Sequence, residues 1–122
     1  MNTKKCILVL APHTDDGEFG CGGTISKIIE EGVDIHYVAF SCAEDSVPEN
    51  MPKNILENEV RLATNVLGIP EKNLHVYNYP VRKLSYHRQD ILEDMVRLNK
   101  MFKPDLVFTP SKYDVHQDHF TV

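Results

Sequence analysis

The chain has 122 residues, of which 42% are hydrophobic and 25% are charged, and this composition is typical of one globular domain. The formal net charge is −5, and no run of Lys or Arg is longer than the pair at 4–5, so a surface for nucleic acid or anionic membranes is disfavoured. No stretch approaches the roughly 18 apolar residues of a membrane span. We therefore expect a single domain over residues 1–122, and small-molecule chemistry stays open.

Cysteine usage indicates the compartment. Cys6, Cys21 and Cys42 are odd in number and form no Cys-x-x-Cys pair, so no disulfide framework is implied. Free thiols are typical of a reducing compartment, and we predict a cytoplasmic protein.

Apolar patterns predict alternating strands and helices. The continuous apolar run Cys6–Ala11 is typical of a strand that is buried on both faces of a parallel sheet. Three helices are predicted from apolar residues at helical spacing, and three further short apolar runs are predicted strands. The predicted strands are Cys6–Ala11, Ile35–Phe40, Leu74–Tyr77 and Leu106–Phe108, and the predicted helices lie within Gly20–Gly32, Leu56–Leu67 and Ile91–Phe102. This order predicts an α/β fold, a Rossmann-like three-layer sandwich with a mostly parallel sheet and strand order 3-2-1-4.

Two clusters of ionisable residues follow the first and fourth predicted strands. With that strand order the two strands are neighbours, and their carboxyl ends share one crevice. So many carboxylates and imidazoles in one crevice require a cation, and this donor set suits zinc or ferrous iron. The spacing leaves open which of the two later histidines binds metal. The clusters are His13, Asp15, Asp16 and Glu18, and Asp114, His116, Asp118 and His119.

These residues carry a resemblance to a known family. The segment Ala11–Thr24, with its His-Thr-Asp-Asp-Gly-Glu run, and the His-Gln-Asp-His segment at 116–119 resemble the PIG-L/LmbE-like family of zinc-dependent N-deacetylases. The segment Glu59–Gly68 is similar too. The resemblance implies a Rossmann-like fold and a zinc-dependent hydrolase that removes an acyl group, expected to be acetyl, from the amide nitrogen of a small amino-sugar-like substrate.

The resemblance also implies roles for individual residues. His13, Asp16 and His119 correspond to the ligands of one Zn²⁺ per chain, with Fe²⁺ as the alternative ion. Asp15 corresponds to the general base, and His116 to the histidine on the oxyanion side. Consecutive side chains of an extended loop point in different directions, so Asp16 can bind metal while Asp15 reaches the attacking water.

A further expectation concerns the charge on His116. We expect a protonated His116 to hold the oxyanion, and we expect Asp114 or Asp118 to maintain its charge.

The chain departs from the family pattern at four places. Thr14 stands where Pro is usual, and the acidic Glu18 comes one position late, with its role left open. Leu56 stands where many members carry Arg, which leaves the substrate undefined. Family members usually continue well beyond the second histidine motif, so we expect the family's C-terminal portion to be missing. We also expect a homo-oligomer or another chain to cover the outer edge of the fourth strand.

Two alternatives to the enzyme remain. One is a catalytically incomplete metal-binding module that needs a missing segment or a partner chain to complete its pocket. The other is a nucleotide-binding domain, but Gly20–Gly23 lacks the Gly-x-Gly-x-x-Gly pattern, and residues 40–42 supply no acid after the second strand. An intact Asp15 beside a full ligand set favours the enzyme. The expected partner is a small N-acylated substrate, with no nucleic acid and no membrane span.

Overall fold

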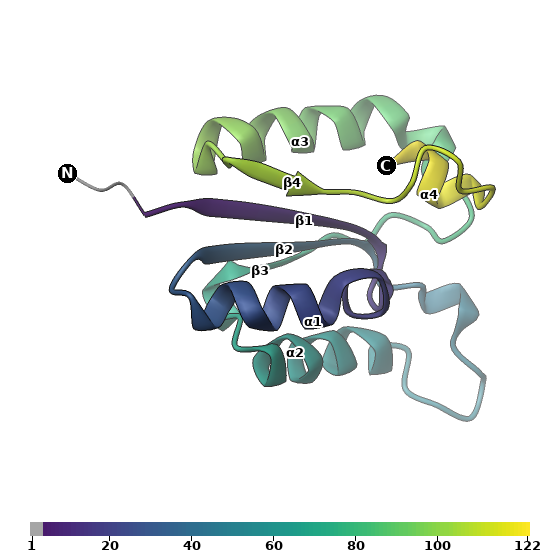
Figure 1. Cartoon of the computed structure of the whole chain (residues 1–122). Helices are drawn as coiled ribbons and strands as arrows, with labels where there is room; N and C mark the ends of the chain where they lie inside the picture. Colours follow the sequence, from purple (N-terminus) through teal and green to yellow (C-terminus); the bar gives the residue numbers. More distant parts are fainter. Residues whose placement is uncertain (1–3) are drawn as a thin grey trace.

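A four-stranded parallel sheet forms the centre of the molecule (Figure 1). The computed structural model describes residues 4–122. The strands lie in the order β3-β2-β1-β4, and every pairing is parallel. They are β1 (Cys6–His13), β2 (Asp34–Ser41), β3 (Leu74–Val76) and β4 (Leu106–Phe108). The predicted fold class and strand order are confirmed.

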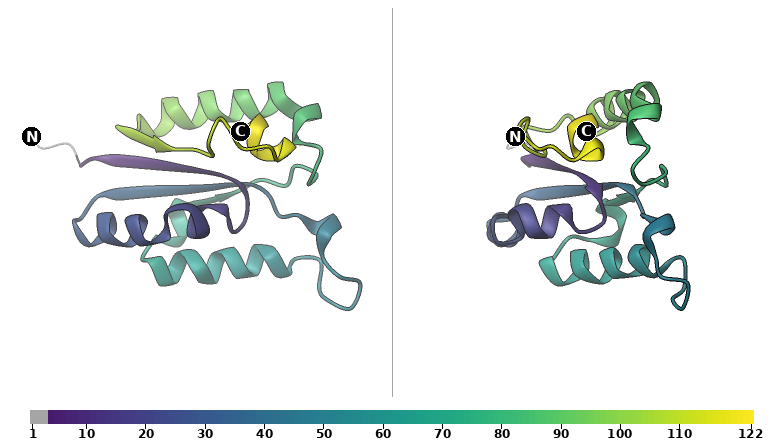
Figure 2. Two further views of the ribbon diagram at one scale, coloured as in Figure 1. Left: turned by 45° about the vertical axis from the view of Figure 1, so that its right-hand side comes forward. Right: turned by 90° about the vertical axis from the view of Figure 1, so that its right-hand side faces the viewer.

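Helices cover both faces of the sheet. Helices α1 and α2 lie on one face, α3 lies on the other, and the short α4 follows β4 (Figures 1 and 2). The bounds are α1 (Asp16–Glu30), α2 (Ile55–Leu67), α3 (Arg88–Phe102) and α4 (Gln117–Thr121). Three short 3₁₀ turns, which the apolar pattern does not predict, are η1 (Glu44–Ser46), η2 (Glu71–Asn73) and η3 (Leu84–His87). None of the helices described in residues 4–122 is long and apolar enough to cross a membrane.

The alternation of side chains along β1 explains its continuous apolar run. Ile7 and Val9 join the core beneath α1 and α2, whereas Leu8 and Leu10 join the core beneath α3. Successive strand residues point to opposite faces, so a central strand with a helical layer on each side must be apolar at every position. Because its last residue is His13, this strand brings an imidazole to the carboxyl edge of the sheet.

The sequence predicts the end of α2 correctly but places the start of α1 too late. Helix α2 ends at Gly68, whose φ of +93° is a left-handed conformation that glycine adopts without strain. Helix α1 begins at Asp16, earlier than the pattern predicts, and has a kink at Cys21. Its first turn is polar or glycine-rich, and the apolar periodicity starts only at Ile25. That first turn carries side chains of the candidate site.

The outer side of β4 is open. Leu106 is 48% exposed and Val107 is 40% exposed, although both belong to a strand of a parallel sheet. Among residues 4–122, β4 pairs only with β1. This edge therefore presents apolar side chains and free backbone groups together.

Candidate metal and catalytic site

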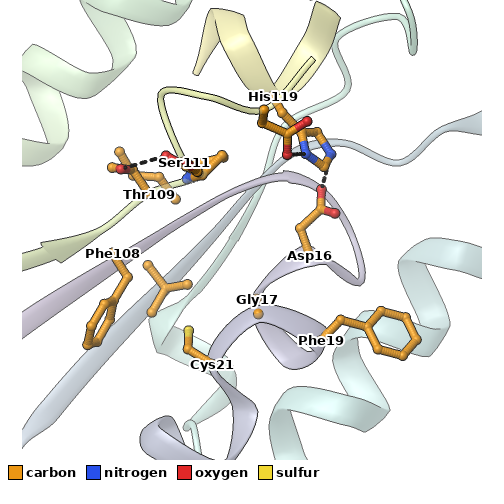
Figure 3. A pocket seen from close by; sticks show the side chains of 13 residues that line it. Asp16, Gly17, Phe19, Cys21, Phe108, Thr109, Ser111 and His119 are labelled. Atoms are coloured by element: carbon orange, nitrogen blue, oxygen red, sulfur yellow. Dashed lines mark hydrogen bonds and ion pairs between the residues drawn. The ribbon is translucent and has the colours of Figure 1, made fainter. Parts of the chain in front are cut away.

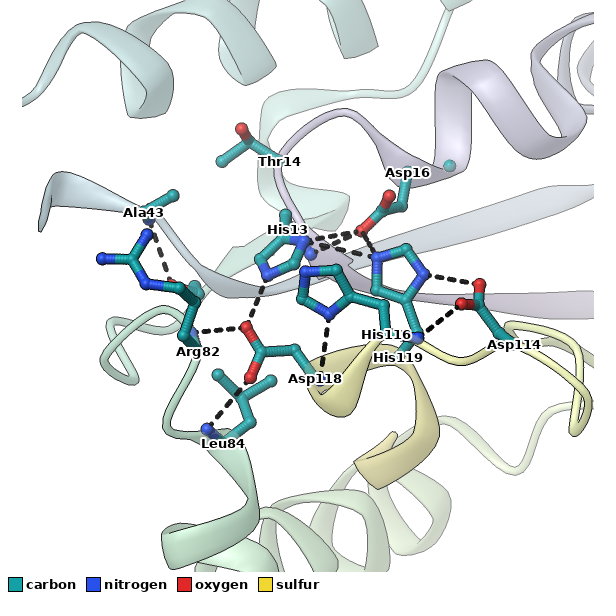
Figure 4. Close-up of polar contacts among 12 residues, drawn as sticks. His13, Thr14, Asp16, Ala43, Arg82, Leu84, Asp114, His116, Asp118 and His119 are labelled. Carbon is teal, nitrogen blue, oxygen red and sulfur yellow. Dashed lines mark hydrogen bonds and ion pairs between the residues drawn. The ribbon is translucent and has the colours of Figure 1, made fainter. Parts of the chain in front are cut away.

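Three side chains converge at the carboxyl edge of the sheet (Figure 4). His13 ends β1, Asp16 opens α1 and His119 lies in α4. Asp16 Oδ2 lies 3.3 Å from His13 Nδ1 and 3.1 Å from His119 Nε2, and the two nitrogens are 3.4 Å apart. Donors bound to a tetrahedral zinc at about 2.1 Å lie about 3.4 Å from one another. The predicted ligands are thus brought together at a spacing that fits such an ion.

Carboxylates hold the outer nitrogens of both imidazoles. His13 Nε2 lies 2.7 Å from Asp118 Oδ2, and His119 Nδ1 lies 2.8 Å from Asp114 Oδ2. A carboxylate accepts a hydrogen bond from the ring N–H that it faces, so the other nitrogen of each ring can offer a lone pair to a metal ion once its proton has left. Both rings turn that second nitrogen toward Asp16.

Asp118 is completely buried and accepts three hydrogen bonds. Besides His13, its donors are the backbone N–H groups of Arg82 at 2.6 Å and Leu84 at 3.2 Å. Burial disfavours a charged carboxylate, but the hydrogen bond with His13 and these two N–H groups keep the pKa of Asp118 below its usual value. Arg82, whose N–H makes the shorter of these two backbone contacts, has a left-handed backbone conformation with a φ of +66°. Neither Arg82 nor Leu84 is predicted from the sequence, because no local pattern marks a backbone N–H that donates to a distant carboxylate.

Neighbouring groups also favour the charged form of His13, Asp16 and Asp114. Burial opposes the charge on His13, yet its hydrogen bonds with Asp16 and Asp118 raise the pKa of His13 above its usual value. The pKa of Asp16 is lowered despite burial, chiefly by its hydrogen bonds with the His13 ring and backbone. The backbone N–H of His116 and the ring of His119 lower the pKa of Asp114. Without a metal, the cluster holds together as alternating acids and imidazoles.

His116 is held differently from the other two histidines. Its Nδ1 accepts a hydrogen bond from the backbone N–H of Asp118 at 3.0 Å, so the side chain caps the start of α4. The expectation that Asp114 or Asp118 supports a charge on its ring is wrong, because those carboxylates hold His119 and His13. An Nδ1 that accepts an N–H carries no proton, so this geometry favours a neutral His116 with its proton on Nε2.

Asp15 occupies the N-cap position of α1 and is exposed. The expectation of an extended loop is therefore wrong at this point, because Asp15 and Asp16 are the first residues of a helix. Their side chains still diverge: Asp16 faces His13 and His119, and Asp15 lines a cavity together with His116.

Two cavities flank the three donors. The α2-side cavity, of about 490 Å³, contains both residues expected to be catalytic, and the β4-side cavity, of about 500 Å³, lies between α1 and β4 (Figure 3). The α2-side cavity is lined by His13, Thr14, Asp15, Glu18, Phe19, Ala43, Ser46, Leu56, Glu59, Val60, Ala63, Val81, Arg82 and His116. Leu56, which stands where an Arg is common in the family, thus faces this cavity.

Tyr37 supports the loop that presents the site. Its buried hydroxyl accepts a hydrogen bond from the N–H of Gly17 at 3.0 Å and lies 3.3 Å from the carbonyl oxygen of Thr14, to which it donates. Glu18 is half-buried beside it, burial raises the pKa of its carboxyl, and its Oε1 has no hydrogen-bond partner among the described residues. The apolar pattern of β2 predicts Tyr37 only as a core residue, so its second role was missed.

The comparison with family models matches residues 8–122 to "PIG-L: GlcNAc-PI de-N-acetylase". The chain belongs to the PIG-L family. The predicted membership is thereby confirmed, and both histidine motifs lie within the matched range.

Individual relatives and solved structures agree with this family. The chain is 28% identical to a diacetylchitobiose deacetylase of Thermococcus kodakarensis over 97% of its length, and 29% identical to a probable N-acetyl-α-D-glucosaminyl L-malate deacetylase 2 of Bacillus anthracis over 98%. It spans 46% and 56% of these relatives, about half their length. The structure of the N,N′-diacetylchitobiose deacetylase of Pyrococcus horikoshii superimposes with a TM-score of 0.84 and 29% identity, covering 96% of this chain and 46% of that chain.

The fold alone does not decide the reaction. The 4-carboxy-2-hydroxymuconate hydratase GalB of a Pseudomonas shares the fold with a TM-score of 0.76 at 23% identity, covering 94% of this chain and 51% of that chain. A shared fold supports different chemistry when the site differs. The side chains at the carboxyl edge of the sheet therefore determine which reaction is possible.

Proposed function

We propose that this chain carries the catalytic site of a zinc-dependent N-deacetylase that releases an acyl group, acetyl in the first instance, from a small amino-sugar-like substrate. One observation carries the proposal. His13, Asp16 and His119 offer three donor atoms within 3.1–3.4 Å of one another, next to a cavity that Asp15 and His116 both line. Three protein ligands with a remaining open position are typical of catalytic zinc sites.

Each residue has a distinct task in amide hydrolysis. A zinc ion at the three donors would polarise the amide carbonyl and lower the pKa of the attacking water toward about 7. Asp15, exposed in the cavity, takes the proton from that water and passes it to the leaving amine. His116 donates from Nε2 to the oxyanion that develops on the carbonyl oxygen when water adds to the amide carbon, since its Nδ1 is occupied by the N–H of Asp118.

The relatives support an amino-sugar substrate. The names of two relatives describe deacetylases of diacetylchitobiose and of a glucosaminyl malate, both of which carry N-acetylglucosamine units. The α2-side cavity, of about 490 Å³, is large enough for one such unit. We place the activity in the cytoplasm, on the ground that Cys6, Cys21 and Cys42 are all free thiols.

A release assay tests this function. The chain, treated with a chelator and then reloaded with Zn²⁺ or Fe²⁺, is incubated with a panel of N-acetylated amino sugars, and free acetate and free amine are measured. We expect equal amounts of both products, loss of activity with the chelator and recovery with the ion. Metal binding at one ion per chain without release from any panel member would overturn the deacetylase assignment.

A second candidate is a metal-binding module that becomes active only when its pocket is completed. The exposed Leu106 and Val107 favour it, because they leave an uncovered apolar edge on β4, the strand whose last residue, Phe108, lines the β4-side cavity. A homo-oligomer or another chain would cover this edge. Stoichiometric metal binding and an acetate signal that rises steeply with protein concentration would support this candidate over a self-sufficient enzyme.

A further inference from the structure

Phe19 is a large apolar side chain in an unusual place. It is 86% exposed in the first turn of α1, three residues after Asp16 and four after Asp15. Residues three or four apart lie on the same side of a helix, so the ring stands one turn from both aspartates. Figure 3 shows it directed away from Cys21 and Phe108. The ring therefore lies on the surface beside the candidate site instead of filling the core.

The α2-side cavity supplies a surface that matches this ring. Leu56, Val60 and Ala63 from α2 form an apolar wall, and Phe19 is the aromatic residue of the lining in the part of the chain that the structure describes. Ligand pockets combine such apolar walls with a few polar groups that fix orientation. Here the aromatic ring and the proposed catalytic residues face the same space.

Carboxylates provide the polar groups. Glu18 and Glu59 line the same cavity from α1 and α2; Glu18 is half-buried with its Oε1 enclosed, whereas Glu59 is exposed. An exposed carboxylate at the wall of a cavity can accept hydrogen bonds from the hydroxyl groups of a ligand. A pyranose ring has this pair of properties, because its C–H faces are apolar and the hydroxyl groups at its rim are donors.

We propose that Phe19 is the stacking platform of a pyranose subsite, with the exposed carboxylate of Glu59 accepting a hydrogen bond from a hydroxyl of the same sugar ring. The inference rests on the proposed function and deepens it, because it assigns the sugar moiety, not the acyl group, to this surface. Phe19 acts in binding and selection of the substrate, and it takes no part in the proton transfers. A flat, rigid ring contributes contact area at little entropic cost.

The kinetic experiment compares two acetamides. N-acetylglucosamine carries the pyranose, and N-acetylethanolamine presents the same amide without a ring. We expect Phe19→Ala to raise KM for N-acetylglucosamine about tenfold and to leave kcat and the acyclic substrate unchanged, because only the stacking contact is lost. Phe19→Tyr should restore KM. The matched control is Tyr86→Ala, an equally exposed aromatic residue (82%) that lines neither cavity.

A binding experiment separates this inference from the proposed function. The chain contains no tryptophan, so Phe19→Trp places a single tryptophan at the platform, whose emission is excited selectively over that of the tyrosines. We expect glucosamine to shift its emission to shorter wavelength and ethanolamine to leave it unchanged. Binding without acetate release would overturn the proposed function and support the subsite. The subsite would be overturned if the wild type and Phe19→Ala released acetate with equal kinetics. It would also be overturned if the emission maximum depended only on protein concentration, because a second copy of the chain would then be covering the ring.

Discussion

His13 Nε2 and Asp118 Oδ2 are 2.7 Å apart, which ties the end of β1 to α4 across 105 residues of sequence. Asp118 is completely buried, and it also accepts the backbone N–H groups of Arg82 and Leu84. One carboxylate thus fixes the orientation of a proposed metal ligand and the position of a third segment. Because the ligand and its support belong to different elements, the site depends on the assembled fold.

We predict that Asp118→Asn lowers zinc affinity about 10- to 100-fold while the fold is kept. The amide oxygen can still accept a backbone N–H, but the negative charge that strengthens His13 as a ligand is gone. Asp118→Ala leaves three donors without an acceptor and should lower the free energy of unfolding by about 3 kcal/mol or more. Competition with a chromophoric chelator measures the affinity, and urea unfolding measures the stability.

The exposed Asp45 provides the matched control for this substitution. Asp45→Asn removes the same charge from the chain and should change neither quantity. If Asp118→Asn bound zinc as tightly as the wild type, the contact with His13 would have no influence on the metal.

The two neighbouring aspartates should respond to the same substitution in opposite ways. Asp16→Asn removes an anionic donor that lies 3.1–3.3 Å from the two histidine nitrogens, so metal affinity should fall. Asp15→Asn should leave zinc bound, lower kcat more than it raises KM, and flatten the acidic limb of the pH profile. Metal content and kinetics of both variants decide this. A metal-free Asp15→Asn beside a metal-bound, active Asp16→Asn would reverse the two roles.

His116 has two tasks that different substitutions separate. His116→Ala removes both the cap on the N–H of Asp118 and the Nε2 donor, whereas His116→Asn keeps a good capping residue and removes only the donor. We expect kcat to fall in both variants by a factor that corresponds to about 3 kcal/mol, by analogy with the loss of one oxyanion-hole donor. Only His116→Ala should also lower the melting temperature. A fully active His116→Asn would exclude the proposed donor role.

Much of the fold follows from periodicity, because each layer imposes a repeat on the sequence. The continuous apolar run of β1 and the helical spacing of α2 and α3 predict these elements and their order. The first turn of α1 was missed because glycines and acids occupy it for the site rather than for the core. Both histidine motifs mark the site, but the partners of the histidines cannot be read from spacing. Which imidazole Asp114 and Asp118 serve depends on how α4 packs against η3, and this is decided by tertiary contacts.

The stability of the metal-free protein should depend on pH through His13. Its pKa is raised in the folded state, so its protonation stabilises the fold below a pH of about 6.5, and this contribution is lost as the pH rises through the folded pKa. Asp16, Asp114 and Asp118 have lowered pKa values, so their contribution is present above about pH 4 and is lost as the pH falls further.

Near neutral pH, zinc should oppose the loss of stability that the metal-free protein shows as the pH rises, because zinc binds the deprotonated imidazole. Between about pH 6 and pH 8 we expect the melting temperature to fall in the presence of a chelator and the increment on adding zinc to grow. Calorimetry at matched ionic strength measures both. A zinc increment that does not change with pH would show that His13 is not a ligand.

Gly17 occupies a position where a side chain does not fit. A Cβ built there would lie 2.3–2.6 Å from ring atoms of Tyr37, a fully buried residue whose hydroxyl binds Gly17 N–H and the Thr14 carbonyl. We predict that Gly17→Ala lowers the free energy of unfolding by about 1–3 kcal/mol, although alanine is the better helix former. Displacing Tyr37 should also disturb the loop 13–16 and weaken zinc binding.

Gly23 in the same helix is the control for this overpacking. A Cβ there meets no atom within 4 Å, so Gly23→Ala should gain helix propensity and stabilise the protein by up to about 1 kcal/mol without changing metal affinity. Urea unfolding and zinc titration of both variants measure the difference. If Gly17→Ala and Gly23→Ala had the same effect, close packing against Tyr37 would not be the reason for a glycine at position 17.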